Sequence, residues 1–430
     1  MAKDINYSEK FESFRGKTLY ERLRPEQQAF LQQIAFHYRL TFQEFRQVVD
    51  ACRDLEMWGV GFLADWWEEQ TATLDKQGVA AKKQLLTRLQ SYLTDLRKAA
   101  KKYPEEGLQR PKKREKSRVV TKASEKKVFG MCPVASPRTV CCNLRTIDVV
   151  ENCIFGCSYC TIQTFYHEEI VFDANLGEKL RQIQLEPDRF YHIGTGQSSD
   201  SLAWGNRNGI LDDLCGFAAD HPNILLEFKT KSNNIRYFLE NQVPPNIVCS
   251  WSLNTPTIIK NEEHFTASLE ERIKAARQVA DQGIRVAFHF HPMVYYSGWD
   301  EDYPRIAHQL LQLFSPEEVL FISFGSVTLI KPVMQQIRKL GHPTKILQME
   351  FVKDPHGKFT YPDHLKVHMF RTMYNAFSPW HEKVFFYLCM EKAEIWMQTF
   401  GYVYESNEQF EEALARSSRM KLSMESVLSK

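Results

Sequence analysis

The sequence predicts an α/β protein in which a partly open (β/α)6 barrel follows an N-terminal helical region. Between about residues 144 and 326, six short apolar segments alternate with amphipathic helical segments. Such alternation is typical of parallel strands joined by right-handed crossovers. Polar residues also recur on one face of several of these segments, although a flat parallel sheet between helices is apolar on both faces. A curved sheet with a polar interior explains both observations.

The N-terminal region, residues 1–103, has the spacing of amphipathic helices. Apolar residues recur three and four positions apart within 29–58 and 82–102, a period that indicates helices with one buried face. Pro104 and the basic stretch after it end this pattern, so we expect a linker over 104–130. The barrel should then span 131–343, and a C-terminal α+β extension 344–430.

The strands of the barrel are expected where short apolar runs occur, at 144–150, 190–195, 224–231, 246–254, 285–292 and 319–326. Side chains two positions apart along a strand share a face. Glu227, Lys229 and Lys231 therefore face one side of their strand, and His289 and His291 share a side of a later one. We expect these faces to line the barrel interior, where ligands bind at the carboxyl ends of the strands.

Composition restricts where the protein works. The 430 residues are 43% hydrophobic, enough for a large core. No secretory signal is recognisable, and no apolar run approaches the roughly 20 residues that cross a bilayer. We therefore expect a cytoplasmic protein, in which thiols stay reduced. The clustered members of its ten cysteines then point to metal binding or catalysis, and the scattered ones to burial.

The net charge of +2 hides a strongly basic segment. Between Arg97 and Lys127 there are 13 Lys and Arg residues against 4 Asp and Glu, and the density is greatest over 110–127. A solvated linker explains such a run. An electrostatic contact to a nucleic-acid backbone explains it as well, which makes DNA a candidate partner.

Three cysteines follow the first predicted strand as Cys153-x-x-x-Cys157-x-x-Cys160. A structural zinc site needs four ligands, and His167 or the cysteine pair at 141–142 could supply the fourth. Iron–sulfur clusters are also held by thiolates, and a cubane normally takes four. Three thiolates leave one iron of a [4Fe–4S] cluster open to another ligand.

This spacing, directly after the first strand of a six-fold βα barrel, resembles the radical S-adenosylmethionine (radical SAM) superfamily. The resemblance implies a partial (β/α)6 radical SAM barrel whose three cysteines hold a [4Fe–4S] cluster. S-adenosylmethionine would bind the open iron and be cleaved reductively to a 5′-deoxyadenosyl radical. An electron donor such as ferredoxin or flavodoxin is then implied. Tyr159, just before the third cysteine, also fits the superfamily.

Further segments, among them GTGQSSDSLAW, FKTKSNNI, SWSLNTP and FYLCME, resemble the spore photoproduct lyase family from about residue 143 to 401. Members of that family reverse a UV-induced thymine–thymine cross-link in DNA. The resemblance implies that the cofactor is held by the matching residues, which are Ser199, Asp200, Lys231 and Ser252, with Asn254 beside them. An ammonium such as that of Lys231 suits the cofactor's carboxylate. Asp200 could equally cap a helix.

Two positions of the family's radical relay are altered. A cysteine of the family, which returns a hydrogen atom to the substrate radical, is replaced by Gln197, and a tyrosine by Thr161. A primary amide offers no weak bond to hydrogen. The candidate catalytic residues are nevertheless Gln197, at the relay position of the cysteine, and Tyr159, just before the third cysteine of the motif.

The sequence offers other cysteines that could replace the missing thiol. Cys249 falls on an outward strand face, Cys215 within an amphipathic helix, and Cys389 at a position that we expect to serve packing. Cys132 and the 141–142 pair precede the first strand and could approach the site.

Three functions remain open from the sequence. The first is a radical SAM lyase for DNA repair, which the motif, cofactor positions and basic segment favour. The second is a radical SAM enzyme acting on a peptide or small molecule, because fold alone does not set the substrate. The third is a non-catalytic iron–sulfur sensor whose N-terminal helices recruit a partner.

Overall fold

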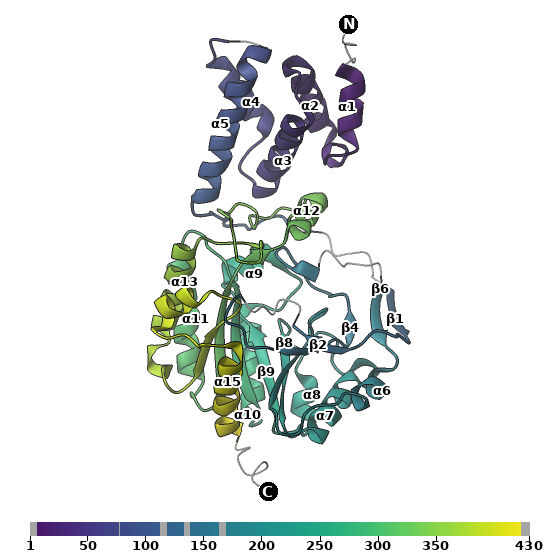
Figure 1. Cartoon of the computed structure of the whole chain (residues 1–430), viewed down its shortest axis with the longest axis vertical. Coiled ribbons are helices and arrows are strands. Elements are labelled where there is room, and N and C mark those ends of the chain that lie inside the picture. The colour runs from purple at the N-terminus through teal and green to yellow at the C-terminus, as the bar shows by residue number, and fades with distance from the viewer. Residues whose placement is uncertain (1–6, 77, 112–117, 133–137, 163–168, 423–430) are drawn as a thin grey trace. The chain divides into compact units, whose positions relative to one another are not determined.

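The computed structural model describes residues 7–76, 78–111, 118–132, 138–162 and 169–422. The chain divides into two compact units. Figure 1 labels their helices and strands. The first is formed by Met1–Pro111 and Ile330–Phe351, and the second by Lys112–Leu329 and Val352–Lys430.

The first unit is helical. Its helices are α1 (Tyr7–Arg15), η1 (Tyr20–Arg22), α2 (Pro25–Tyr38), α3 (Phe42–Trp58), α4 (Leu63–Ala72), α5 (Val79–Lys98) and α12 (Lys331–Leu340). Thr41 begins α3 by accepting a hydrogen bond from the Glu44 amide, and Gly59 ends it in the left-handed conformation, as helix caps commonly do. Cys52 is buried within α3, so its expected place in the core is confirmed.

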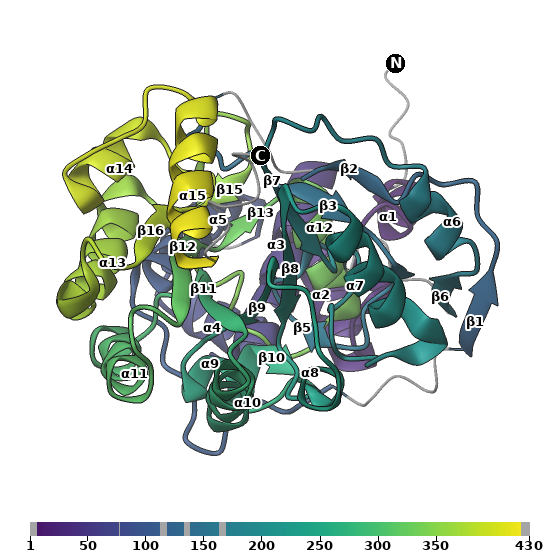
Figure 2. The same ribbon diagram turned by 90° about the horizontal axis from the view of Figure 1, so that it is seen from below.

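The second unit is built on an eight-stranded sheet in the order β16-β12-β11-β9-β8-β7-β3-β2. The strands are β2 (Phe129–Met131), β3 (Arg145–Ile147), β7 (Tyr191–Thr195), β8 (Ile224–Thr230), β9 (Ile247–Ser252), β11 (Arg285–Met293), β12 (Val319–Ser326) and β16 (Phe385–Leu388). All neighbouring pairs are parallel except β2 with β3. The sheet curls into a partial barrel (Figure 2), which confirms the predicted fold class.

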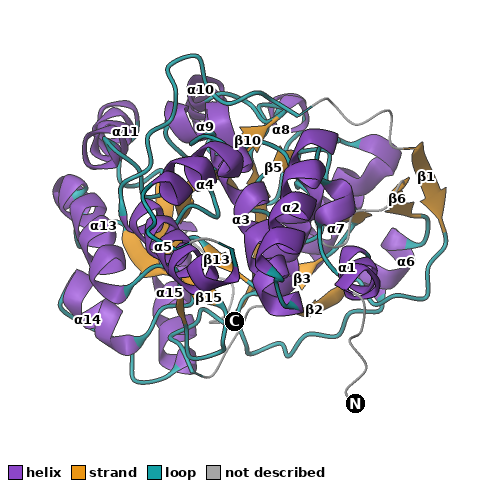
Figure 3. Cartoon of the chain, turned by 90° about the horizontal axis from the view of Figure 1, so that it is seen from above, coloured by secondary structure: helices purple, strands orange, loops and turns teal. Residues whose placement is uncertain are grey.

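Helices of this unit lie on the outer side of the curled sheet, as α7, α8, α10 and α11 show (Figures 2 and 3). They are α6 (Leu176–Arg181), η3 (Arg207–Gly209), α7 (Ile210–Asp220), α8 (Arg236–Glu240), α9 (Pro256–Glu262), α10 (Leu269–Asp281), α11 (Trp299–Leu313), α13 (Asp363–Ala376), η4 (Ser378–Trp380), α14 (Ala393–Phe400) and α15 (Asn407–Leu422). Cys249 of β9 is buried within electrostatic range of Cys215 of α7. Both thiols therefore belong to the layer between sheet and helices, as predicted.

One predicted strand is shorter than expected. The segment 144–150 leaves the main sheet after Ile147, because the Asp148 carboxylate accepts hydrogen bonds from the backbone and hydroxyl of Ser198 at 3.0 and 3.1 Å. Val150–Glu151 (β4) instead joins a separate sheet, in the order β1-β6-β4. That sheet also contains β1 (Arg118–Lys122) and β6 (Glu169–Asp173).

The basic segment is thus partly a strand rather than only a linker. β1 occupies part of it and pairs in parallel with β6. This pairing leaves the side chains of Val119 and Val120 half-buried. The remaining strands are short and comprise β5 (Gly156–Cys157), β10 (Glu263–His264), β13 (Thr328–Leu329), β14 (Val352–Lys353) and β15 (Phe359–Thr360). Among the described helices, none combines the length and apolar character that a membrane span requires.

The barrel interior is polar, as strand parity predicted. The buried carboxylate of Glu227 accepts hydrogen bonds from Nε2 of His192 at 2.7 Å, Nε2 of His289 at 2.5 Å and Oγ of Ser250 at 2.5 Å. Because a carboxylate only accepts, both imidazoles carry their proton on Nε2. A neutral His289 then accepts from Oγ of Ser323 at its Nδ1, 2.6 Å away. The network fixes side chains of β7, β8, β9, β11 and β12 around one charge.

Candidate functional site

The cysteine loop is anchored by a short two-stranded ladder. β5 pairs antiparallel with β10, which places Glu263 opposite Cys157 and His264 opposite Gly156. The Ser158 amide extends this pairing by donating to the carbonyl oxygen of Glu262 at 2.8 Å. The conformation of the cysteine loop is therefore fixed by backbone hydrogen bonds to the segment around β10 as well as by its own turns.

The three motif cysteines lie in one electrostatic environment. None of the three forms a disulfide, and Cys153 and Cys160 both act on the pKa of Cys157. Burial raises the pKa of all three thiols, that of Cys153 to about 12, while the Lys231 ammonium opposes this rise at each of them. Metal binding requires thiolates, and a cation beside three buried thiols favours that form. This donor set fits an iron–sulfur cluster.

A mononuclear zinc site has no comparable support. Within the described part of the chain, no three Cys, His, Asp or Glu side chains converge as ligands of a single metal ion. His167, considered above as a fourth ligand, lies outside the described residues.

Ser199 and Asp200 follow β7 and play different parts. The Asp200 carboxylate accepts from the amides of Leu202 and Ala203 at 3.0 and 2.9 Å, and from the Lys231 amide at 2.7 Å. Hydrogen bonds from the protein thus engage the Asp200 carboxylate, which connects the loop after β7 to the end of β8. The Ser199 hydroxyl is buried and has no hydrogen-bond partner among the described residues. A buried polar atom normally finds a partner, so Ser199 fits a bound ligand such as S-adenosylmethionine.

Lys231, just after β8, presents its charge to the cysteine loop. Its Nζ lies 5.8 Å from the ring centroid of Tyr159, and no ion pair to Lys231 occurs among the described side chains. Ser252 ends β9, is buried, and uses its carbonyl oxygen to accept from Nη1 of Arg272 at 2.8 Å. The two predicted cofactor residues thus lie at adjacent strand ends, where the free ammonium can receive a carboxylate.

Asn254 is placed differently from the role that the resemblance implied. It is completely buried, and its amide nitrogen donates to Oε1 of Glu263 at 3.2 Å and to the carbonyl oxygen of Pro292 at 3.0 Å. Its oxygen accepts from the Tyr303 hydroxyl at 2.7 Å. This side chain positions its neighbours and has little capacity left for a ligand.

Sequence reasoning missed two charged residues at the centre of the site. Glu263 accepts the hydroxyl proton of Tyr159 in a short hydrogen bond and pairs with Nη2 of Arg272 at 2.7 Å. Burial would raise the pKa of Glu263, but the charges of Arg272 and Lys231 hold it below its usual value. The signal was available, because Arg272 lies on the stripe of Leu269 and Ala276, which is otherwise apolar.

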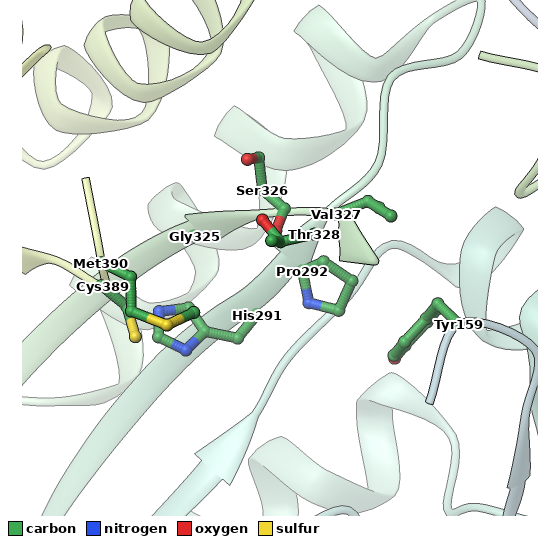
Figure 4. A pocket seen from close by; sticks show the side chains of 9 residues that line it. All are labelled: Tyr159, His291, Pro292, Gly325, Ser326, Val327, Thr328, Cys389 and Met390. Carbon is green, nitrogen blue, oxygen red and sulfur yellow. The ribbon is translucent and has the colours of Figure 1, made fainter. Parts of the chain in front are cut away.

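A pocket of about 170 Å³ opens beside the cysteine loop. Tyr159 lines one side of it, and the ends of β11, β12 and β16 supply the rest (Figure 4). Its lining residues are Tyr159, His291, Pro292, Gly325, Ser326, Val327, Thr328, Cys389 and Met390. Gln197 is not among them, and its backbone amide contacts Asp148 instead. Of the two candidate catalytic residues, the structure brings only Tyr159 to the pocket.

His291 connects this pocket to the interior network. Its Nε2 lies 3.1 Å from Oγ of Ser323, the hydroxyl that also contacts His289. Burial lowers the pKa of His291 well below its usual value, and the charge of Lys229 adds to the effect. The imidazole is therefore neutral near pH 7, and it points toward Cys389 (Figure 4).

Comparison with known proteins gives one consistent result. The family model for spore photoproduct lyase matches residues 142–377, more than half of the chain. The chain is 25% identical over 227 residues to the spore photoproduct lyase of Clostridium acetobutylicum, covering 50% of this chain and 67% of that protein. It is 24% identical over 209 residues to the Bacillus subtilis enzyme, covering 46% and 61%. The matches thus span about two thirds of these relatives' length.

Solved structures share the fold. A spore photoproduct lyase complexed with dinucleoside spore photoproduct aligns with a TM-score of 0.54 at 19% identity, over 63% of this chain and 82% of that one. A mutant lyase with bound AdoMet and the same dinucleoside aligns with a TM-score of 0.53 at 20% identity, over the same shares. Together with the match of the family model, these results show that the chain belongs to the spore photoproduct lyase family of radical SAM lyases.

Proposed function

We propose that this protein repairs a thymine–thymine photoproduct in DNA by radical SAM chemistry. The observation that carries the proposal is the arrangement at the strand ends. The three motif thiols share one electrostatic environment with the Lys231 ammonium, which lies 5.8 Å from the ring of Tyr159, a residue that lines the pocket. The buried Ser199 hydroxyl, after β7, has no hydrogen-bond partner among the described residues. Clusters of ligand-ready groups at the carboxyl ends of parallel strands are typical of active sites.

Cys153, Cys157 and Cys160 would hold a [4Fe–4S] cluster, and Ser199, Lys231 and Ser252 would hold S-adenosylmethionine. When bound, this pair would supply a 5′-deoxyadenosyl radical for the removal of a hydrogen atom from the substrate. The protein's own contribution is positioning. Lys231 would pair with the cofactor carboxylate, and Ser199 would donate or accept one hydrogen bond.

Glu263 and Asp200 support this site without binding the cofactor directly. Glu263 holds Tyr159 of the cysteine loop, and Asp200 fixes the backbone of Lys231. Such supporting contacts decide whether ligand groups stay in register. The buried interior network around Glu227 keeps the barrel floor rigid and excludes water.

Binding of DNA would draw on the basic segment, part of which forms β1. Arg118 and Lys122 at the ends of β1 are exposed, and exposed positive charge attracts a phosphate backbone. A ferredoxin or flavodoxin would supply the electron. None of the ten cysteines forms a disulfide, which suits a reducing compartment and supports the expected cytoplasmic location.

The test is release of 5′-deoxyadenosine from the anaerobically reconstituted full chain with dithionite. Synthetic dinucleoside spore photoproduct and undamaged thymidine dinucleotide are compared as substrates, and restored thymines are measured by mass spectrometry. We expect release that depends on the lesion and yields repaired dinucleotide. The variant Cys157→Ala should lose release together with the visible absorption of the cluster, whereas Cys249→Ala on the outward face should keep both.

Other outcomes select the other functions. Gln197 and Thr161 leave room for a different substrate, so release that is indifferent to the lesion would favour a peptide or small-molecule reaction. A loaded cluster that never cleaves S-adenosylmethionine would favour a sensor.

A further inference from the structure

The proposed reaction requires a hydrogen-atom donor, and this inference rests on that proposed function. Abstraction of one hydrogen and scission of the cross-link leave a carbon radical on the second thymine. Because the repaired thymines together contain the hydrogens of the lesion, one hydrogen atom must be returned. Gln197 cannot return it, since an amide N–H bond is too strong and its side chain does not line the pocket.

Cys389 is the thiol that the fold brings to this pocket. It directly follows β16, and its amide donates to the carbonyl oxygen of Phe324 at 2.9 Å. Leu388 pairs with Phe324 in the parallel register of β16 and β12, so Cys389 stands at the carboxyl edge of the sheet. The next residue, Met390, has a positive φ of 58°, an uncommon conformation for a side chain of this size. The chain thus turns sharply there and leaves Cys389 at the pocket wall.

The opposite side of the same pocket is Tyr159 of the cysteine loop (Figure 4). A base placed between these two walls would therefore have the cluster loop on one side and a thiol on the other. Cys389 is the only thiol among the described residues that line the pocket. Of the neighbouring thiols, Cys142 and Cys141 interact with each other through their side chains.

We propose that Cys389 donates the hydrogen atom that quenches the thymine radical. An S–H bond is about as weak as the allylic C–H bond that forms and is far weaker than an amide N–H bond, so a thiol is the side chain suited to this transfer. The carbon radical takes the hydrogen atom and becomes a C–H bond, while Cys389 becomes a thiyl radical. The thiyl returns to the thiol by taking one electron from the ferredoxin- or flavodoxin-type donor and one proton from water.

The surroundings keep Cys389 in the form that can donate a hydrogen atom. Burial raises the pKa of Cys389 to about 12, Cys132 and Cys141 add to the rise, and only Lys229 among the principal neighbours opposes it. A thiolate carries no hydrogen atom to give, so a thiol that stays protonated across physiological pH meets the requirement. His291 shares the pocket but is too weak a base to deprotonate Cys389, because burial lowers the pKa of its imidazole well below the usual value.

The experiment labels the exchangeable S–H hydrogen with deuterium and asks whether the label reaches the repaired thymine. The reconstituted full chain repairs synthetic dinucleoside spore photoproduct in D2O, and deuterium in the restored thymines is measured by mass spectrometry. The thiol exchanges with solvent, whereas the C–H hydrogens of 5′-deoxyadenosine do not. We expect the wild type to place a single deuterium in one thymine methyl group. Cys389→Ala should lose this labelled product while still releasing 5′-deoxyadenosine.

Matched variants separate a catalytic role from a structural one. Cys142→Ala, a neighbouring thiol outside the pocket lining, and Cys249→Ala, on the outward face, should keep the label. Binding of the dinucleoside lesion to metal-free Cys389→Ala, measured by calorimetry, should equal that of the wild type, because a methyl group leaves the pocket formed. Labelled repair by Cys389→Ala at the wild-type level would overturn the assignment of Cys389 alone. A wild type that cleaves S-adenosylmethionine but repairs no lesion would overturn the proposed function, and this inference with it.

Discussion

The phenol of Tyr159 donates a hydrogen bond to the carboxylate of Glu263, and Arg272 holds that carboxylate from α10 at 2.7 Å. Arg272 also donates to the carbonyl oxygen of Ser252 at the end of β9. One buried ion pair thus links the cysteine loop to a strand end that carries a proposed cofactor residue. The geometry of the cluster loop and that of the cofactor groups are therefore coupled.

Replacing Glu263 by Gln should damage both stability and cluster binding. Removing one member of a buried ion pair leaves the other charge without compensation, which costs about 3–5 kcal/mol. We expect the free energy of unfolding in urea to fall by an amount of that order, and the iron content after reconstitution to fall as well. Glu270→Gln, at an exposed position of α10, the helix that carries Arg272, is the control and should change neither. Unaltered iron loading in Glu263→Gln would show that Glu263 does not organise the loop.

Two neighbouring serines allow a matched test of the cofactor site. The Ser199 hydroxyl has no partner among the described residues, so Ser199→Ala should leave the unfolding free energy unchanged. Its affinity for S-adenosylmethionine should fall by about 1 kcal/mol, the contribution of one hydrogen bond. The Ser201 hydroxyl, in contrast, bonds Thr195 at 2.8 and 2.9 Å. Ser201→Ala should therefore lower stability by about 1 kcal/mol with little effect on affinity.

Calorimetry of S-adenosylmethionine binding and urea unfolding together decide this test. If Ser199→Ala lost stability and kept affinity, its hydroxyl would be a structural group and the proposed cofactor contact would be wrong.

Local patterns predicted the barrel because each strand carries its own signal. The apolar runs gave the strands, and the parity of Glu227 and His289 gave a polar interior, where the two side chains indeed meet at 2.5 Å. The strand expected at 144–150 was partly wrong, since the break at Asp148 depends on Ser198, a contact fifty residues away. No local pattern contains such a partner.

The site residues that sequence reasoning missed have the same character. Cys389 was expected to serve packing, yet it lines the pocket, and its place there follows from the pairing of β16 with β12. Glu263 lies just after a short helix and gains its role from Tyr159 and Arg272. Long-range pairing decides both, whereas the cysteine motif was recognisable because its three ligands are consecutive on one loop.

The interior histidines predict a loss of stability in acid. Burial lowers the pKa of His289 to about 4, with the charge of Lys229 as the next cause and Glu227 opposing it. In the unfolded chain, the imidazole has its usual pKa of about 6.5. Between pH 6.5 and 4 the unfolded chain therefore binds a proton at this histidine that the folded state does not bind. The stability contributed by neutral His289 is thus present above pH 6.5 and is lost as the pH falls toward 4. The full loss is about 3 kcal/mol.

This pH dependence can be assigned to one residue. Urea unfolding of His289→Gln at several pH values should show a shallower decline between pH 6.5 and 4 than the wild type. The pKa values of Glu227 and His291 are also lowered in the folded state, so both residues also reduce stability as the pH falls. The variant should therefore keep a residual slope. Identical slopes in the two proteins would show that His289 does not refuse the proton.

The close approach of Gly325 to His291 gives a test of the pocket itself. A Cβ atom at residue 325 would lie 2.9 Å from Cδ2 of His291, nearer than two carbon atoms normally pack. Gly325→Ala should therefore push the imidazole into the pocket and weaken binding of the dinucleoside lesion, measured by calorimetry on the metal-free protein. Adding His291→Ala should restore binding, because the alanine methyl group then meets open space.

Gly216→Ala in α7, where a Cβ would meet nothing within 4 Å, is the control. It should raise stability by about 0.5–1 kcal/mol and leave lesion binding unchanged. If Gly325→Ala bound the lesion as tightly as the wild type, the space between Tyr159 and Cys389 would not be where the damaged base sits.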